Sequence, residues 1–402
     1  MDWLLAAVFC LVYLGMMMGR LPGLALDRTG VALLGAIAVV ATGRLRGDHL
    51  LAAIDAPTLA LLFGLMILSA QFRLGGFYSA VVRRMAGLSS GPRLLLGLLM
   101  ALAGLFSAVL ANDIVCLAMA PVLVELCARR GLNPVPFLLG LACAANIGSA
   151  ATLIGNPQNM LIGQVLKMSF SGYLARAAGP ALAGLLAAWL IILWLSRGRW
   201  LAHTGLPPLD TPEFDPWQTA KGLALAVVLV AAFLWGHWPR EVCALAAAGV
   251  LLCSRRMRTS RMLGLVDWPL LVLFIGLFVV NHAVAAAGLD KMLAARLESL
   301  GLDISRPGAL FLATAVLSNL VSNVPAVMLL LPHAAHPLAG EVLALSSTLA
   351  GNLLVVGSIA NIIVVDQAAR LGVVISWREH ARVGVPVTIA TLALAYVWLS
   401  AL

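Results

Sequence analysis

Charged residues are scarce in this sequence, and their scarcity excludes a soluble globular protein. Asp, Glu, Lys and Arg together make up 11% of the 402 residues, whereas 62% of the residues are hydrophobic. A soluble domain carries about 25% charged residues, so this chain has too little polar surface to cover itself in water. With a mean hydropathy of +1.01, the chain is predicted to be an integral membrane protein.

Segments in which polar and apolar residues alternate are also missing, and this argues against a transmembrane β-barrel. Apolar runs of helical length recur along the chain instead. Only helices and closed barrels satisfy their backbone hydrogen bonds within lipid. The pattern therefore predicts an all-α polytopic membrane protein.

The sequence further lacks the residue patterns of metal, redox and hydrolytic sites. No CxxC or CxxH pattern is formed by its six cysteines, which are Cys10, Cys116, Cys127, Cys143, Cys243 and Cys253. Each lies in or beside an apolar segment, where Cys packs as a small apolar residue. Neither an HExxH motif nor a facing pair of acids within the membrane is present, so we predict neither an enzyme nor a bound cofactor.

The excess of basic residues is interpreted as a topology signal. Lys and Arg outnumber Asp and Glu by 26 to 17, which gives a net charge of +9. Most Arg residues lie in short loops on one side of the predicted spans, and the positive-inside rule makes that side cytoplasmic. The first span, 3–19, is followed by Arg20 and preceded by no basic residue, so we expect it to be retained. We expect both termini to be external, in the cytoplasmic (inner) membrane of a bacterium, with the lipid bilayer and no nucleic acid as partner.

Eight apolar segments are predicted to be ordinary spans: 3–19, 29–43, 57–72 and 174–196 in the first half, and 219–236, 240–253, 268–284 and 383–401 in the second. Four other segments are interrupted by polar residues. Segments 94–128 and 307–333 are too long for one crossing and are predicted to be re-entrant helical hairpins. Segments 134–166 and 341–366 are each predicted to cross once as a broken helix.

The interruptions form two copies of one pattern. The first copy carries Ser107, Asn112, Pro121, Asn146 and the run Gly155-Asn156-Pro157-Gln158-Asn159; the second carries Ser318, Asn323, Pro332, Asn352 and the run Gly357-Ser358-Ile359-Ala360-Asn361. Gly64 likewise matches Gly276, so the repeat extends over the chain. Each half crosses an odd number of times, and the two halves are therefore predicted to have inverted topology.

This repeat defines the expected domain organisation. Residues 1–200 form repeat 1, with scaffold spans in 3–72, the hairpin 94–128, the broken helix 134–166 and the span 174–196. Residues 201–218 form a cytoplasmic linker that is rich in proline. Residues 219–402 form repeat 2, with scaffold spans in 219–284, the hairpin 307–333, the broken helix 341–366 and the span 383–401.

The four helix breaks are predicted to form a binding site. A helix broken in lipid exposes N–H and C=O groups that survive only where protein or a water-filled cavity covers them. Positive helix N-termini can hold an anion there, and unwound carbonyls can hold a cation such as Na⁺. A single Asn would indicate only a helix cap or a contact between helices, but breaks in matched pairs favour a site. The candidate residues are Asn112, Asp113, Asn146, Gly148, Ser149, Thr152, Gly155, Asn156 and Asn159, and then Ser322, Asn323, Val324, Asn352, Gly357, Ser358 and Asn361.

Na⁺ is expected, if it binds, at the Asn112/Asn146 and Asn323/Asn352 breaks. Asp113 is the one acid that the sequence places near the middle of the membrane, where a charge costs about 2.5–3.5 kcal/mol on insertion scales. Three roles are open for it: a proton carrier, a cation ligand or a buried structural acid.

Other charges are expected to lie away from the breaks. Glu125 and Asp366 lie nearer the ends of spans and are expected to face water. No Lys or Arg lies within the breaks, so helix dipoles, backbone N–H groups and Asn or Ser side chains would have to hold an anion. That arrangement suits a weakly held, releasable ligand, and a neutral polar ligand stays open.

These motifs resemble those of the ion transporter superfamily over nearly the whole chain. Ala111-Asn112-Asp113 resembles the hairpin motif of the arsenite-permease and NhaD-type (ArsB/NhaD) branch, and the run from Gly155 to Asn159 is similar to the broken helix of bacterial anion permeases. The related divalent anion:sodium symporters carry Ser-Asn-Thr at both hairpin tips, whereas this chain keeps the Asn and loses the Thr in both. The resemblance implies a homodimer in which a transport domain moves like an elevator against a fixed scaffold domain.

The sequence therefore predicts an ion-coupled secondary active transporter, a permease, for a small inorganic or organic anion or oxyanion-type solute. Whether the coupling ion is H⁺ or Na⁺ stays open at this point. The alternative is a Na⁺/H⁺ antiporter of the NhaD type that uses Asp113. A channel is a further alternative, and currents that exceed carrier turnover would reveal it.

Overall fold

The computed structural model of the protein describes residues 2–19, 25–45, 47–201, 213–299 and 303–402. Within these ranges the chain is helical, and the one extended pairing is an isolated bridge between Leu132 and Leu201. Arg20 and residues 202–212 of the expected linker lie outside the described ranges. The all-helical class expected from the composition is therefore confirmed for the described residues.

Helices occupy all eight segments that were predicted to be ordinary spans. They are α1 (Trp3–Met18), α2 (Arg28–Ala41), α4 (Ala56–Leu74), α10 (Phe170–Leu195), α11 (Pro216–Trp235), α12 (Arg240–Leu252), α14 (Trp268–Ala286) and α20 (Trp377–Ser400). In the described part of the chain, six helices are long and apolar enough to cross a membrane: α4, α6 (Pro92–Val109), α10, α11, α14 and α20. Four short helices had not been predicted: α3 (Asp48–Ala53), α5 (Phe77–Ala86), α13 (Thr259–Leu263) and α15 (Leu289–Ser299).

Local sequence explains where the long helices begin. At α4 and α14 an Asp caps the helix and a Pro occupies the first turn, an arrangement that suits the N-terminus. The Asp55 carboxylate accepts from Thr58 N at 2.9 Å, and the Asp267 carboxylate accepts from Leu270 N at 2.9 Å. The two matched segments of the sequence repeat thus start their helices by the same device.

The four interrupted segments each consist of two helical pieces. The first pair is α6 (Pro92–Val109) with α7 (Asn112–Arg129), and its counterpart is α16 (Pro307–Val321) with α17 (Asn323–Leu330), which continues into η1 (Leu331–His333). The second pair is α8 (Pro134–Ser149) with α9 (Pro157–Val165), and its counterpart is α18 (Ala339–Ala350) with α19 (Ile359–Arg370), with η2 (Val355–Gly357) between them. Helix breaks therefore occur at all four places where polar residues interrupt the apolar pattern.

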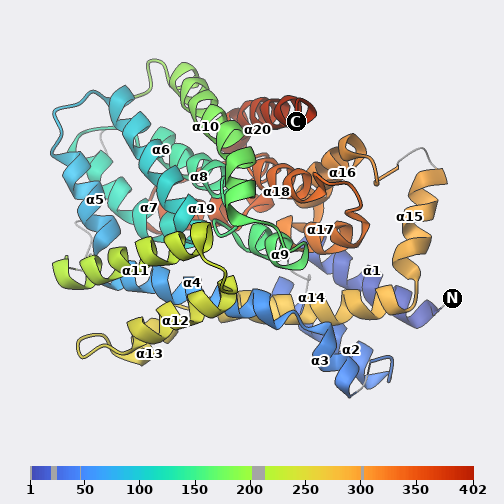
Figure 1. Ribbon diagram of the computed structural model, residues 1–402. Coiled ribbons are helices and arrows are strands. Elements are labelled where there is room, and N and C mark those ends of the chain that lie inside the picture. The colour runs from blue at the N-terminus through green and yellow to red at the C-terminus, as the bar shows by residue number, and fades with distance from the viewer. Residues whose placement is uncertain (1, 20–24, 46, 202–212, 300–302) are drawn as a thin grey trace.

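The two halves of the chain pack into one another through matched helices. Helix α12 of the second half packs against α4 of the first, beside which it lies in Figure 1, and α2 of the first half packs against α14 of the second. The matched glycines Gly64 and Gly276 lie at these contacts. A Cβ at Gly64 would lie 2.6 Å from the backbone of Ala244, and a Cβ at Gly276 would lie 2.7 Å from the backbone of Ala32. Equivalent positions of the repeat thus make equivalent close contacts with the opposite half.

Glu125 departs from the sequence expectation. It had been expected to face water, but only 7% of the residue is exposed. The carboxylate bonds to Arg129 one helical turn later, whose side chain is 70% exposed. The arginine reaches the surface while its partner stays covered, which is how a carboxylate can be buried near the end of α7. Asp366, in contrast, is half-exposed and pairs with Arg370, as its place near a helix end had suggested.

Candidate functional site

The two broken helices cross at Asn146. Its Nδ2 donates to Asn352 Oδ1 at 2.8 Å and to Asn361 Oδ1 at 3.1 Å, and both partners belong to the second half. Its Oδ1 accepts from Ser358 Oγ at 2.8 Å and from Asn112 Nδ2 at 3.4 Å. One buried amide thus connects the first hairpin tip with both ends of the second break.

A second set of contacts joins the halves beside the first break. Asn156 Nδ2 donates to Ser149 Oγ at 3.0 Å and to Thr348 Oγ1 at 3.2 Å. Gln158 Nε2 also donates to Thr348 Oγ1, at 3.1 Å. Asn159 Nδ2 donates to the Thr152 carbonyl at 2.9 Å, which satisfies one of the groups that the break exposes. The broken helices therefore saturate many of one another's polar groups.

Each hairpin tip lies against the broken helix of its own half. Asn112 N donates to the Gly155 carbonyl at 3.3 Å, and Thr152 Oγ1 donates to the Ala108 carbonyl at 2.5 Å. In the second half, Asn319 Nδ2 donates to the Ala350 carbonyl at 3.0 Å. The tip residue Ser322 has φ 77°, an unusual backbone conformation for a residue other than Gly.

Asn323 is buried, as Asn112 is. The two residues are 8% and 5% exposed, and a Cβ at Gly351 would lie 3.3 Å from Asn323 Nδ2. Asn361, at the start of α19, donates from Nδ2 to the Gly351 carbonyl at 2.8 Å. The second tip therefore sits at the break that Asn146 joins from the other side. The two tips are linked through this crossing rather than through a hydrogen bond between Asn112 and Asn323.

Side-chain oxygens at the two tips form a matched set without hydrogen-bond partners in the described residues. The set consists of Ser107 Oγ and Asn112 Oδ1 in the first half, and Ser318 Oγ and Asn323 Oδ1 in the second. All four residues are buried. A buried polar atom without a partner is costly, and each such atom calls for an explanation such as an ion or solute. The tips therefore hold oxygen atoms that are available to a ligand.

Helix N-termini also converge on the crossing. Helices α7, α9, α17 and α19 begin at Asn112, Pro157, Asn323 and Ile359, at the four breaks. Asn156 caps α9 through a bond from Asn159 N at 2.9 Å. No side chain among the described residues caps α7, α17 or α19. Uncapped N-termini carry free N–H groups and a positive partial charge, which suits an anion.

The candidate glycines have packing roles. A Cβ at Gly148 would lie 2.2 Å from the Gly104 carbonyl oxygen, so Gly148 allows α8 to approach α6 rather than lining the crossing. A Cβ at Gly155 would lie 2.3 Å from the Ser149 carbonyl oxygen, and one at Gly357 would lie 2.8 Å from Asn319 Oδ1. These positions need Gly because backbone and side-chain atoms occupy the space of a Cβ. Val324, also a candidate, is buried and apolar.

Asp113 lies on the side of the first tip that faces the scaffold helices. It lines a cavity of about 250 Å³ together with Arg73 of α4 and Asp267 at the start of α14. A second cavity, of about 360 Å³, contains Asp55, which is the repeat counterpart of Asp267, and Met328, which is the counterpart of Leu117 in the first cavity. The two cavities are thus built from equivalent parts of the two halves.

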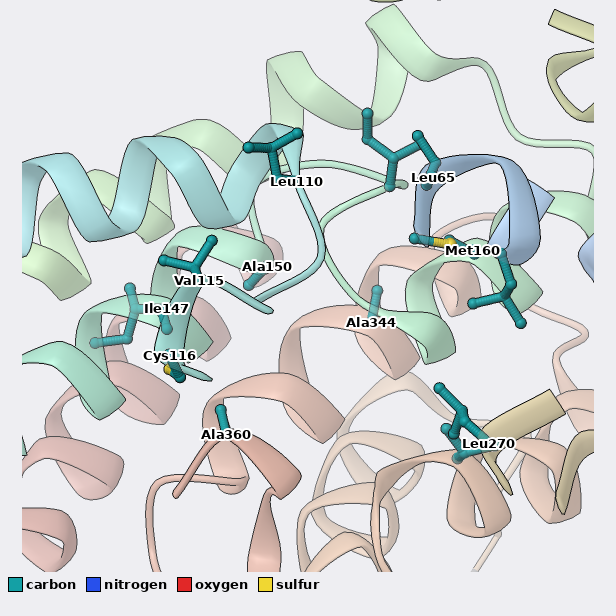
Figure 2. Packing of buried hydrophobic residues seen from close by; sticks show 14 of the residues in the cluster. Leu65, Leu110, Val115, Cys116, Ile147, Ala150, Met160, Leu270, Ala344 and Ala360 are labelled. Carbon is teal, nitrogen blue, oxygen red and sulfur yellow. The ribbon is translucent and has the colours of Figure 1, made fainter. Parts of the chain in front are cut away.

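An apolar shell encloses the polar crossing. Figure 2 shows Leu110, Val115, Ile147 and Ala150 together beside the first break, with Ala360 of the second half below them in that view. Each of these side chains is at most 4% exposed. Polar contacts in such surroundings are stronger than in water, and a missing partner there costs more.

Several residues of the crossing had not been predicted. Thr348, Gln158, Tyr173 and His380 are all buried and all bond within or beside the breaks. Gln158 lay inside the recognised run from Gly155 to Asn159. Thr348 follows two serines just before the second break, and a polar run inside an apolar segment was an available signal. Tyr173 and His380 lie near the starts of α10 and α20, and no local pattern marks them.

The comparisons with known proteins place the chain in a family. Residues 13–350 match the family described as citrate transporter, CitMHS. An uncharacterized transporter of Mycobacterium tuberculosis is 31% identical, with 93% of this chain and 94% of that protein covered. The inner membrane protein YbiR of Escherichia coli is 32% identical, with 82% and 84% covered. The silicon efflux transporter LSI3 of Oryza sativa subsp. japonica is 29% identical, with 93% and 92% covered.

The fold also resembles that of a solved structure. The crystal structure of the Alcanivorax borkumensis YdaH transporter, which has an unusual topology, matches with a TM-score of 0.59 and 16% sequence identity. The match covers 99% of this chain and 96% of that one. Together with the family match and the curated relatives, this confirms the superfamily resemblance found in the sequence. The family and these relatives are transporters. The chain is a multi-pass membrane protein that belongs to the citrate transporter family, a family of secondary transporters.

Proposed function

We propose that the protein is an ion-coupled secondary active transporter for a small anion or oxyanion-type solute. The observation that carries this proposal is the convergence of four helix N-termini, three of them without a side-chain cap in the described residues, on one buried crossing. Helix N-termini hold anions through free N–H groups and the helix dipole. No cationic side chain is needed for such a site, and the held anion remains releasable.

The coupling ion in this proposal binds at the hairpin tips. Asn112 Oδ1 and Asn323 Oδ1, with the matched serine hydroxyls, are neutral oxygens without partners among the described residues. Neutral oxygens at helix breaks suit Na⁺, which transporters of this kind hold with unwound carbonyls and amide oxygens. The tips would hold the coupling ion, and the adjacent helix N-termini would hold the anion.

The arrangement of the halves supports alternating access. The matched contacts of Gly64 and Gly276 with the opposite half are what two inverted repeats would make. The two equivalent cavities, one beside Asp113 and one beside Asp55, lie between the scaffold helices and the hairpin arms. In an inverted repeat they open toward opposite sides of the membrane, one for each orientation of the carrier. In this proposal the hairpins and broken helices move together like an elevator. The protein is a homodimer in a bacterial inner membrane, with both termini external.

The test is transport by purified protein in proteoliposomes. Citrate, sulfate, phosphate, arsenite and silicic acid serve as solutes, with a Na⁺ gradient or a pH gradient imposed separately. Asn112→Ala and Asn323→Ala are expected to abolish gradient-driven transport, because each removes a tip oxygen. Asn133→Ala is the matched control, since Asn133 only caps the far end of α8 and bonds to the Arg199 carbonyl. Unchanged transport in both tip variants would remove the site assignment.

A Na⁺/H⁺ antiporter is the second candidate function. Asp113 favours it, because this acid shares a cavity with Asp267 and has an amide neighbour, Asn112, at the first tip. An antiporter moves protons when only a Na⁺ gradient is imposed, without any anion. Asp113→Asn would abolish that flux. Solute uptake that persists in Asp113→Asn would exclude Asp113 as the shared site.

A further inference from the structure

In each half, one buried side chain of the last helix contacts a backbone carbonyl at the helix break. Tyr173 of α10 donates its hydroxyl hydrogen to the Ala150 carbonyl at 2.7 Å. His380 of α20 lies with Nε2 3.1 Å from the Asn352 carbonyl oxygen. The two residues are 1% and 2% exposed. The Ala150 carbonyl directly follows α8, and the Asn352 carbonyl lies two residues after the end of α18. At both places no continuing helix supplies an N–H partner.

The contact with the Asn352 carbonyl determines which nitrogen of the His380 imidazole carries a hydrogen. A carbonyl oxygen only accepts hydrogen bonds, so Nε2 of His380 carries the hydrogen and donates it. Nδ1 has no hydrogen-bond partner in the described part of the chain. Gly384, one turn further along α20, lies against the same carbonyl: a Cβ there would lie 2.3 Å from the Asn352 oxygen. The face of α20 that carries His380 and Gly384 therefore packs against the backbone of the second break.

Movement at either carbonyl would be transmitted to the crossing. The Asn352 side chain accepts from Asn146 at 2.8 Å, so the backbone that His380 holds also positions this bond between the halves. The Tyr173 hydroxyl also accepts from Asn159 Nδ2 at 3.3 Å, and so holds both sides of the first break.

The two contacts are alike in role but differ in chemistry and register. Aligning the matched residues Arg176 and Arg382 places Leu174, not Tyr173, opposite His380. The same kind of contact is therefore made from neighbouring positions by a phenol in one half and an imidazole in the other. A merely apolar packing position, such as Leu174, would leave the Asn352 carbonyl without this donor.

We propose that Tyr173 and His380 are positioning residues for the solute site. Each donates a hydrogen bond from the last helix of its half to a carbonyl that the break exposes, and so fixes the shape of that break. The proposal rests on the proposed function, since the shape it describes is that of the proposed transport site.

Hydrogen–deuterium exchange tests the structural part without any solute. His380→Leu, which introduces the residue type of position 174, is expected to raise amide exchange in 351–357 by about tenfold, as loss of one buried hydrogen bond would. Exchange in 150–155 should stay unchanged. Tyr173→Phe should do the reverse. His380→Gln keeps an N–H donor near the Nε2 position and should restore slow exchange. If exchange stayed slow in both His380→Leu and Tyr173→Phe, the proposal would be overturned.

Transport kinetics test the link to the site. With citrate, sulfate, phosphate, arsenite and silicic acid as probes, His380→Leu should raise KM about tenfold for the transported probe, with kcat little changed, because a distorted site binds less well. His380→Gln should recover KM. Thr391→Val is the control, because the Thr391 hydroxyl donates to the Val387 and Thr388 carbonyls of α20 itself. Raised exchange with an unchanged KM would overturn the positioning role. If the wild-type protein moved none of the probes, the proposed function would fail, while the exchange data would still decide the hydrogen-bond claim.

Discussion

Substitution of Asn146 by Ala tests the crossing that joins the two halves. The side chain makes bonds of 2.8, 3.1, 2.8 and 3.4 Å to Asn352, Asn361, Ser358 and Asn112, which lie in the second break, in α19 and in α7. Its loss leaves the buried oxygens of Asn352 and Asn361 without their donor. It also removes the acceptor of the Ser358 hydroxyl. The fourth bond, to Asn112, is long and is counted as weak.

The expected cost follows from these three groups. A buried polar group that loses its partner costs about 1–3 kcal/mol, so three such groups give about 3–9 kcal/mol of lost unfolding free energy. The control is Asn133→Ala in the same helix, where the side chain caps the N-terminus and Ala costs about 1 kcal/mol. Asn146 is 1% exposed, so solvent cannot replace the missing partners without opening the crossing.

Unfolding by sodium dodecyl sulfate in mixed micelles measures both variants under the same conditions. A loss for Asn146→Ala within about 1 kcal/mol of the loss for Asn133→Ala would refute the reasoning, because the crossing would then contribute no more than a surface cap. The double variant Asn146→Ala/Asn361→Ala adds a second check. Its loss should fall short of the sum of the single losses by about 1 kcal/mol or more, since both substitutions remove the same bond.

Three further outcomes are expected. Gly148→Ala should destabilise the protein by about 1–3 kcal/mol in thermal unfolding, because its Cβ would overlap a carbonyl of α6, whereas Gly249→Ala, with open space around it, should be neutral or stabilising. Arg176→Ala should cost about 1–3 kcal/mol in the same assay, because Glu341, its partner at 2.7 Å, is 2% exposed and would be left unpaired, whereas an exposed ion pair would cost less than 1 kcal/mol. Asp113→Asn should leave Na⁺-coupled solute uptake intact if the protein is an anion transporter, and uptake that disappears would make Asp113 part of the coupling site.

The sequence predicted the helix breaks well because their causes are local. Asn, Gly and Pro inside apolar segments interrupt a helix by their own chemistry, and the breaks beside Asn112, Asn156 and Ser322 appear where those residues stand. The repeat added a second, independent copy of each signal. Local chemistry and repetition together were sufficient to place the polar elements, although they did not show which of these residues would face one another.

Partnerships across the halves could not be predicted in this way. Asn146 bonds to residues more than 200 positions away, and that pairing depends on how the two halves pack. For the same reason His380 was not predicted, and Glu125 was wrongly expected to face water. Their surroundings come from other helices, so one buried His in α20 or one covered carboxylate in α7 leaves no pattern along the chain. Gly148 was assigned to the site because Gly allows a close backbone approach at a helix break, but the close approach that it makes is to α6.

The most direct test of the account is a structure of the protein with its transported solute bound. We predict solute or coupling-ion density within hydrogen-bonding distance of Asn112 and Asn323, at the starts of α7 and α17. Solute density in the cavity of about 870 Å³ lined by Lys167 and Arg240, with both tips free of ligand, would contradict it.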